Sequence, residues 1–164
     1  METLHLTTLA MVVEYEGKRY FGFQRQSNSP SVQGELEKAL RRMTGEEINI
    51  KGASRTDAGV HAKGQVIAFT TRSGYSPEVF QRALNYYLPE DISIVASYKV
   101  PGGFDPRRAA QRREYRYSIY NSRTPSPLVQ RYSHRIGEPL DIEAMQSAAQ
   151  RLLGNHNFSP FAGA

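Results

Sequence analysis

Residues 92–100 read ISIVASYKV, and they decide the fold more than any other stretch. Apolar residues stand at every second position from the first to the last, which is the period of a β-strand with one buried face. Before them, Ser76 and Pro77 supply an N-cap and a first-turn proline for a helix that Pro89 ends. The apolar face of this helix consists of Phe80, Leu84, Tyr87 and Leu88. A helix followed by an alternating strand indicates a helix packed on a sheet.

The chain before residue 76 carries the same two kinds of element. A helix is predicted after Ser29 and Pro30, and it ends at Gly45. Its apolar face consists of Val32, Leu36, Leu40 and Met43. Strands are predicted at Leu9–Tyr15, Ile48–Lys51 and Val66–Thr71. The resulting order β-α-β-β-α-β is that of a ferredoxin-like domain of the α+β class, with both helices on one face of an antiparallel sheet.

The remaining residues predict a second α+β half. A strand is expected at Glu114–Tyr120, and Asp141 is expected to cap a last helix. That helix should turn Ile142, Met145, Ala149 and Leu152 inward. We therefore predict a ferredoxin-like domain at residues 1–103 and the beginning of a second domain at residues 104–164, which reads as truncated before its next strand.

The composition of the chain excludes several classes of function. The 164 residues include no cysteine, and this absence excludes disulfide frameworks, cysteine–zinc sites and thiol catalysis. The chain carries a formal net charge of +5. No apolar run reaches the length of a membrane span, and the N-terminus lacks the pattern of a secretory signal. The histidines show no metal-ligand spacing. The basic residues gather in one segment that suits an anionic partner such as a nucleic acid, with arginines at 107, 108, 112, 113 and 116.

The segment most suited to chemistry is the loop predicted at residues 52–62, between two predicted strands, which is the candidate catalytic loop. It holds Arg55, Thr56 and Asp57 and is flanked by Gly52 and Gly64. An arginine near a carboxylate favours the ionised form, which can act as a nucleophile or a base. An ordinary ion pair between Arg55 and Asp57 explains the same residues, and spacing alone favours that simpler interpretation.

Motifs that occur in order along nearly the whole chain favour the catalytic interpretation of Arg55 and Asp57 over the ordinary ion pair. Residues 55–62 (RTDAGVHA) resemble the catalytic motif of the tRNA pseudouridine synthases of the TruA type. Further matches follow in the family's order, at residues 14–26, 31–40, 64–66, 85–89, 104–108, 113–120 and 152–154. Because several motifs occur in order, the resemblance is specific.

The resemblance implies an isomerase that converts uridine to pseudouridine at positions 38, 39 and 40 in the anticodon stem-loop of tRNA. The family's catalytic aspartate falls on Asp57, as nucleophile or base, and its active-site arginine falls on Arg55. The family's active-site tyrosine falls on Tyr115, which is expected to stack on the flipped base. The resemblance implies no metal and no cofactor, a homodimer, and a place in the cytoplasm. We expect Arg107 and Arg112 to contact phosphates, and Arg25, in a basic and aromatic loop, to contact RNA.

Some residues depart from the family's pattern. Ser54 stands where the family usually has glycine, and Glu114 stands where a basic or neutral residue is commoner. The family also continues past residue 164, so we expect this chain to be a fragment that binds tRNA weakly and self-associates.

Two alternative functions, and alternative interpretations of two single positions, remain open at this point. A ferredoxin-like RNA-binding module without chemistry explains the charge and the fold, but it gives Arg55 and Asp57 no task. A carboxylate enzyme for a small molecule leaves the arginine cluster unexplained. At single positions, Tyr115 suits sheet packing with Tyr117 and Ile119, and the loop around Arg25 suits plain packing.

Overall fold

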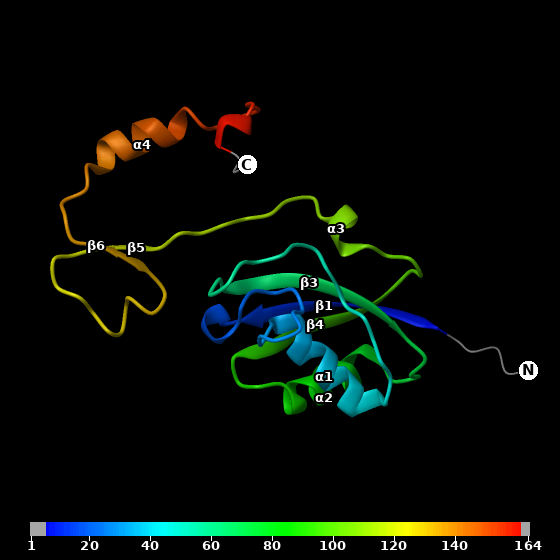
Figure 1. Ribbon diagram of the computed structural model, residues 1–164. Coiled ribbons are helices and arrows are strands. Elements are labelled where there is room, and N and C mark those ends of the chain that lie inside the picture. The colour runs from blue at the N-terminus through cyan, green and yellow to red at the C-terminus, as the bar shows by residue number, and fades with distance from the viewer. Residues whose placement is uncertain (1–5, 162–164) are drawn as a thin grey trace, which may run out of the picture. The chain divides into compact units, whose positions relative to one another are not determined.

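The computed structural model describes residues 6–161 and divides the chain into two compact units, Met1–Arg113 and Glu114–Ala164. The first unit contains a four-stranded antiparallel sheet in the order β2-β3-β1-β4. The strands are β1 (Thr7–Tyr15), β2 (Lys51–Gly52), β3 (Ala62–Thr71) and β4 (Ile92–Val100). Helices α1 (Val32–Thr44) and α2 (Pro77–Tyr87) lie on one face of the sheet (Figure 1). This confirms the α+β class and the ferredoxin-like order.

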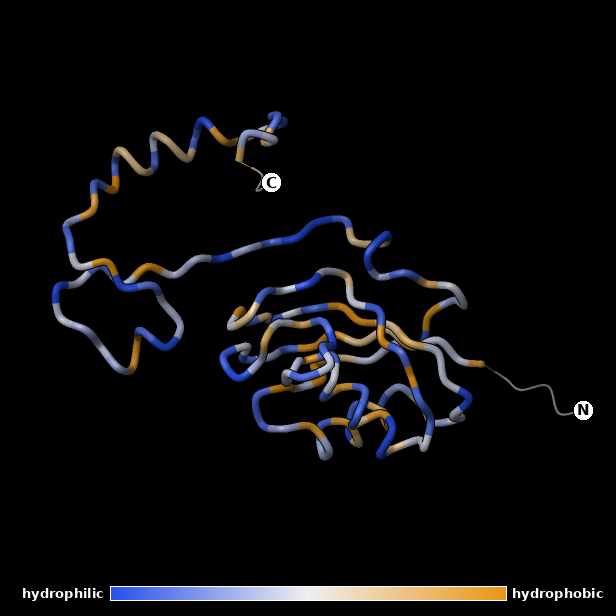
Figure 2. The backbone as a smooth tube through the Cα atoms, viewed as in Figure 1, coloured by the Kyte–Doolittle hydropathy of each residue, from blue (hydrophilic) through white to orange (hydrophobic). Residues whose placement is uncertain are grey.

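The core of the first unit lies between the sheet and the two helices. Alternate residues of β1 point into it, and Leu9, Met11 and Val13 are fully buried. They meet Phe80 and Leu84 of α2 in the same cluster. Figure 2 shows this concentration of apolar residues along the strands. Burial of large aliphatic and aromatic side chains supplies most of the stability of such a domain.

The first helix begins two residues later than predicted. Ser31, and not Ser29, is the N-cap, and its hydroxyl accepts a hydrogen bond from the N–H of Gly34. Gly45 ends the helix with φ +74°, a left-handed conformation that favours glycine. The predicted boundary was wrong because two capping serines flank Pro30, and local sequence does not choose between them.

The strand predicted at Ile48–Lys51 is wrong except for its last residue. Ile48 and Ile50 are buried, but β2 includes only Lys51 and Gly52. The backbone N–H of Ile50 donates to the carboxylate of Glu37, and its carbonyl accepts from the amide of Gln33. Side chains of α1 therefore take the backbone partners that a neighbouring strand would otherwise supply.

The second unit contains a two-stranded parallel pair and one helix. Strands β5 (Ile119–Asn121) and β6 (His134–Ile136) pair with each other, and α4 (Ile142–Gln150) follows. The strand expected at Glu114–Tyr120 is thus wrong for its first five residues, and β6 was not predicted. A strand needs a partner along its length, and within the expected range Glu114–Tyr120 only Ile119 and Tyr120 pair with another strand, β6.

The expected inward face of the last helix is not observed. Asp141 caps α4 as predicted, but Ile142, Met145 and Leu152 are exposed. None of the described residues 114–161 is buried. Apolar residues are nevertheless visible along α4 (Figure 2). The spacing of apolar residues gives a helix an apolar face, but only a packing partner can bury that face.

Candidate active site

Residues 53–61 form the loop that connects the antiparallel strands β2 and β3. Asp57 lies in this loop with its side chain exposed. The N–H of Val60 donates to the carbonyl of Asp57 over 3.2 Å, which closes a turn. Gly59 has φ +79°, which the turn requires and which other residues rarely adopt. The loop therefore presents Asp57 to solvent on a defined turn.

The start of the loop is fixed to β3. The N–H of Ala53 donates to the carbonyl of Val66 over 2.8 Å. The buried amide of Gln65 donates to the carbonyl of Ser54, and its oxygen accepts from the Ser54 hydroxyl over 3.2 Å. Serine at position 54, a departure from the family's usual glycine, thus gains a hydrogen bond that glycine cannot make.

The middle of the loop is fixed to β1 and to the segment after it. Tyr15, the last residue of β1, is buried, and its hydroxyl lies 2.8 Å from the hydroxyl oxygen of Thr56. Burial raises the pKa of the Tyr15 phenol, and the hydrogen bond with Thr56 acts in the opposite direction. The N–H of Phe23 donates to the carbonyl of Thr56 over 3.0 Å. Thr56, directly before Asp57, is therefore held at two atoms.

Arg55 and Asp57 stand in the same loop, and both are exposed. Among the described residues, neither side chain makes an ion pair or a hydrogen bond. The ordinary loop ion pair that the spacing favoured is therefore absent. The contacts that hold the loop involve Ser54 and Thr56, which leaves the charged groups of Arg55 and Asp57 accessible to a ligand.

The arginine-rich segment reaches the base of this loop. Helix α3 (Pro106–Ala109) begins after Asp105, whose carboxylate accepts hydrogen bonds from the N–H groups of Arg107 and Arg108. These backbone hydrogen bonds, that of Arg108 first, hold the pKa of the Asp105 carboxyl below its usual value. The guanidinium of Arg113 donates to the carbonyl of Ala53 over 3.1 Å. The segment thus lies beside the start of the candidate loop.

The four predicted substrate-binding residues have different surroundings. Arg107 and Arg112 are exposed in the segment just described. Arg25 pairs with the buried carboxylate of Glu37 over 3.0 Å, while most of its side chain remains exposed. Tyr115 belongs to the second unit and is 64% exposed, so the sheet packing considered for it is not observed. The roles predicted for all four in substrate binding stay predictions.

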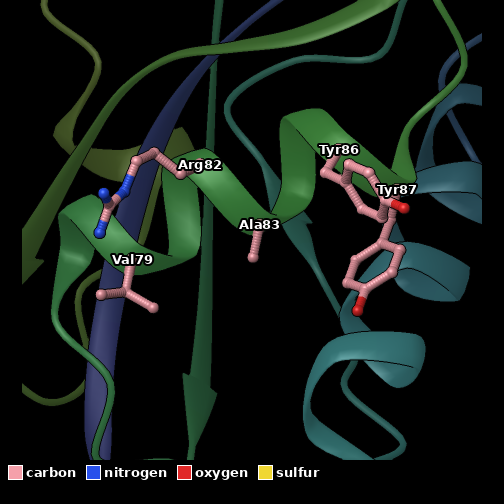
Figure 3. Close-up of a pocket in the computed structure, with 5 residues that line it drawn as sticks. All are labelled: Val79, Arg82, Ala83, Tyr86 and Tyr87. Carbon is pink, nitrogen blue, oxygen red and sulfur yellow. The ribbon is translucent and has the colours of Figure 1, made fainter.

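Other parts of the first unit offer less chemistry. A hollow of about 390 Å³ lies along α2, and its lining residues are Val79, Arg82, Ala83, Tyr86 and Tyr87 (Figure 3). It contains no carboxylate and no residue of the 53–61 loop. In the described residues 6–161, no group of three or more His, Asp or Glu side chains is placed to hold a metal ion. No helix within that range is long and apolar enough to cross a membrane.

Sequence analysis did not assign the residues that support the loop to the site. Tyr15 and Gln65 are both buried. In the sequence, Tyr15 looks like an ordinary core position of its strand, whereas Gln65, a polar residue just before the predicted strand Val66–Thr71, looks exposed. Gly17 and Gly22 lie in a polar segment whose partner is far along the chain. Two signals point to these residues: the motif matches at residues 14–26 and 64–66 contain all four of them, and glycine permits close approach of two backbones.

Comparison with known proteins identifies one family for the region that contains the 53–61 loop. The sequence profile of the family described as tRNA pseudouridine synthase matches residues 11–107. The chain is 44% identical to "tRNA pseudouridine synthase A" of Acetivibrio thermocellus, with 95% of this chain and 64% of the relative covered. It is 46% identical to the protein of that name from Roseiflexus castenholzii, and this match covers 96% of this chain and 58% of the relative. The chain spans about three-fifths of the length of these relatives.

Proposed function

This chain belongs to the tRNA pseudouridine synthase family, and from that premise we propose that its protein isomerises uridine to pseudouridine in tRNA. The substrate positions are 38, 39 and 40 of the anticodon stem-loop, as the resemblance implies. One observation carries the proposal: the family's catalytic motif occupies a loop that is held at several atoms while the Asp57 carboxylate stays accessible.

The reaction rearranges bonds without exchange of electrons. The bond between C1′ of the ribose and N1 of the base breaks, the base turns, and a bond between C1′ and C5 forms. The proton lost from C5 is balanced by one gained at N1. Asp57 serves as nucleophile at the sugar or as the base that removes a sugar proton, and both roles need an ionised carboxylate. The resemblance implies that Arg55 orients Asp57 and helps to open the base pair; among the described residues the two side chains make no ion pair with each other.

The arginine segment supplies the affinity for RNA in this proposal. Exposed Arg107 and Arg112 lie in the segment whose Arg113 contacts the start of the catalytic loop. Phosphate contacts from such residues position a nucleic acid without reading its sequence. Tyr115 then stacks on the target base after it leaves the helix, which offsets part of the unstacking cost of a few kcal/mol.

We further propose that the protein acts as a homodimer in the cytoplasm, with tRNA lying across both subunits. Light scattering of the protein as it is encoded in its gene measures the oligomeric state. A strictly monomeric protein with full activity would contradict the homodimer.

The decisive experiment follows the hydrogen at C5. The protein as encoded is incubated with unmodified tRNA that carries tritium at C5 of its uridines, because formation of the C1′–C5 bond releases that label. We expect release with the wild-type protein and none with Asp57→Asn, while tRNA binding persists. Glu47→Gln removes one negative charge from an exposed ion pair with Arg41, so it is the matched control and should retain activity.

The same assay distinguishes the proposed isomerase from the second candidate function. A ferredoxin-like RNA-binding module without chemistry would bind tRNA and release no tritium from wild-type protein. Wild-type rates in Asp57→Asn would instead end the assignment of Asp57 as nucleophile or base.

A further inference from the structure

We propose that Tyr15 and the segment Gly17–Phe23 form a clamp that positions Asp57 for the reaction. The inference rests on the proposed function, since it concerns how the carboxylate is aimed. The residues of the clamp are positioning residues, because they act through the backbone of the loop and none of them is assigned a contact with the substrate.

The first reason is that the Asp57 carboxylate lacks support of its own. Among residues 6–161 it has no hydrogen-bond or ion-pair partner, and its side chain is exposed. The backbone on either side of Asp57 therefore fixes where its Cα atom lies and along which line its side chain leaves the loop, and so limits the space that the carboxylate can reach. A catalytic group must be held close to its productive geometry before substrate arrives, so the contacts of that backbone determine how well it works.

The second reason is that Tyr15 reaches the residue next to Asp57. The Tyr15 ring is buried and lies 6.3 Å from that of Phe23, centroid to centroid. Its hydroxyl lies 2.8 Å from the Thr56 hydroxyl oxygen. Because the ring belongs to the core, this hydrogen bond transfers the rigidity of the core to the catalytic loop.

The third reason is that the backbone of the segment is hydrogen-bonded to the loop on both sides of Asp57. Before Asp57, the N–H of Phe23 donates to the carbonyl of Thr56 over 3.0 Å. After it, the N–H of Gly59 donates to the carbonyl of Tyr20 over 3.2 Å. These two bonds fix the loop at one residue before Asp57 and two residues after it.

The fourth reason is that two glycines allow the segment to touch the loop directly. A Cβ atom on Gly22 would lie 2.7 Å from the carbonyl oxygen of Thr56, and Gly22 has φ +100°. A Cβ atom on Gly17 would lie 1.9 Å from the carbonyl oxygen of Val60. Both contacts involve backbone atoms that cannot rotate away, so a side chain at either position would displace the loop.

The first test removes only the Tyr15 hydroxyl, in the protein as encoded. We expect Tyr15→Phe to lower kcat by roughly 10-fold, the upper range for one hydrogen bond, with little change in KM. Thr71→Val is the matched control, because it removes another buried hydroxyl hydrogen bond, to Glu46, at the other end of β3. The control should lose stability while keeping kcat.

The partner residue sharpens this test. Thr56→Val should lower kcat as Tyr15→Phe does, and the double variant should be no worse than either single variant, because both remove the same bond. Thr56→Ser keeps the hydroxyl and should retain kcat. Additive losses in the double variant would overturn the role of the bond.

The second test adds a methyl group at a glycine. Gly22→Ala should lower kcat by roughly 100-fold, the effect expected when a catalytic group is displaced by about 1 Å. Gly45→Ala is the matched control, since Gly45 at the end of α1 also has positive φ, but a Cβ atom there would meet no other atom within 4 Å. Equal losses of kcat in both variants would mean that backbone strain alone explains the effect, and would overturn the clamp.

Asp57→Asn in the same assay separates the two proposals. If Asp57→Asn is inactive while Tyr15→Phe and Gly22→Ala keep wild-type kcat, the clamp is wrong and the proposed function stands. If Asp57→Asn is fully active, the assignment of Asp57 fails, and the clamp fails with it.

Discussion

Helix α2 in the first unit and helix α4 in the second begin in the same way. The side chains of Ser76 and Asp141 each accept a hydrogen bond from the backbone N–H three residues further on. Yet α2 buries Phe80 and Leu84 against the sheet, whereas α4 buries no residue. The comparison teaches that a cap and an apolar period are enough to start a helix, while burial depends on a partner surface.

The same contrast extends to the two units as wholes. The first unit buries a large cluster of apolar residues between a sheet and two helices, although several others, among them Phe21, Tyr86 and Tyr98, are exposed. The second leaves exposed several of its large apolar residues, among them Tyr117, Leu128, Leu153 and Phe161. Exposed apolar residues in such numbers are typical of a surface that packs on another element or another molecule. The first unit therefore carries its own stability, and the predictions below test this difference.

The largest difference between the two units is expected when one phenylalanine of each unit is replaced by alanine. Phe80 is fully buried beside Phe69, with ring centroids 5.7 Å apart, whereas Phe161 is 78% exposed. Phe80→Ala should lower the free energy of unfolding by about 3–5 kcal/mol. Phe161→Ala should change it by less than about 0.5 kcal/mol. Urea unfolding of the 164-residue chain measures both, and a large loss in Phe161→Ala would show that this side chain is covered in solution.

A second prediction compares arginines of the two units as contacts for tRNA. Arg107→Ala with Arg112→Ala should reduce the slope of log affinity against log salt by about two units, roughly one per phosphate contact. The matched pair Arg123→Ala with Arg151→Ala removes the same charge from the second unit. Titration of the protein as encoded with tRNA at several salt concentrations measures the slopes.

The salt dependence of tRNA affinity in the two pairs of variants shows which unit contacts the phosphates. An unchanged slope in the first pair would place Arg107 and Arg112 in solvent. Equal reductions in both pairs would mean that the basic surface extends over both units, and would remove the contrast between them.

The smallest effect concerns acid stability in the first unit. Burial tends to raise the pKa of Glu46, but hydrogen bonds from the Thr71 hydroxyl and the N–H of Arg72 outweigh it and lower the pKa below its usual 4.5. A carboxylate with a lowered folded-state pKa stabilises the protein above the unfolded-state pKa, and this contribution is lost as pH falls through the folded value. Glu46→Gln should therefore make stability less dependent on pH below about 4.5.

The size of this effect is below about 1 kcal/mol at neutral pH, because glutamine keeps part of the hydrogen bonding. Unfolding measured between neutral and acid pH tests it. Glu143→Gln in the first turn of α4 is the control, since its carboxylate makes no hydrogen bond within the described residues. A control that alters the acid dependence as much as Glu46→Gln would contradict the assignment to Glu46.

Most elements of the first unit were predicted from local sequence. The alternation at Ile92–Val100 gave a strand with the observed bounds, and the capping signals at Ser76 and Pro77 gave α2 its observed start. The order of elements then led to the observed sheet topology, because few arrangements of β-α-β-β-α-β satisfy the rules of chain connection. In the candidate site, the motif placed Asp57 and Arg55 on a loop between two strands, where the structure has them.

The sequence by itself determined which segments of the first unit form the two main helices and most of the strands, and it determined the starts of α2, β4 and α4, because caps, prolines and apolar periods act over a few residues. Only the tertiary structure decided what each element meets. The Tyr15 hydroxyl finds Thr56 across 41 positions of sequence, and the backbone of Ile50 pairs with α1 side chains in place of a strand. Such contacts depend on the folded position of the partner, and no local pattern contains that position. For the same reason, the spacing of α4 predicted its apolar face but not whether the face would be buried.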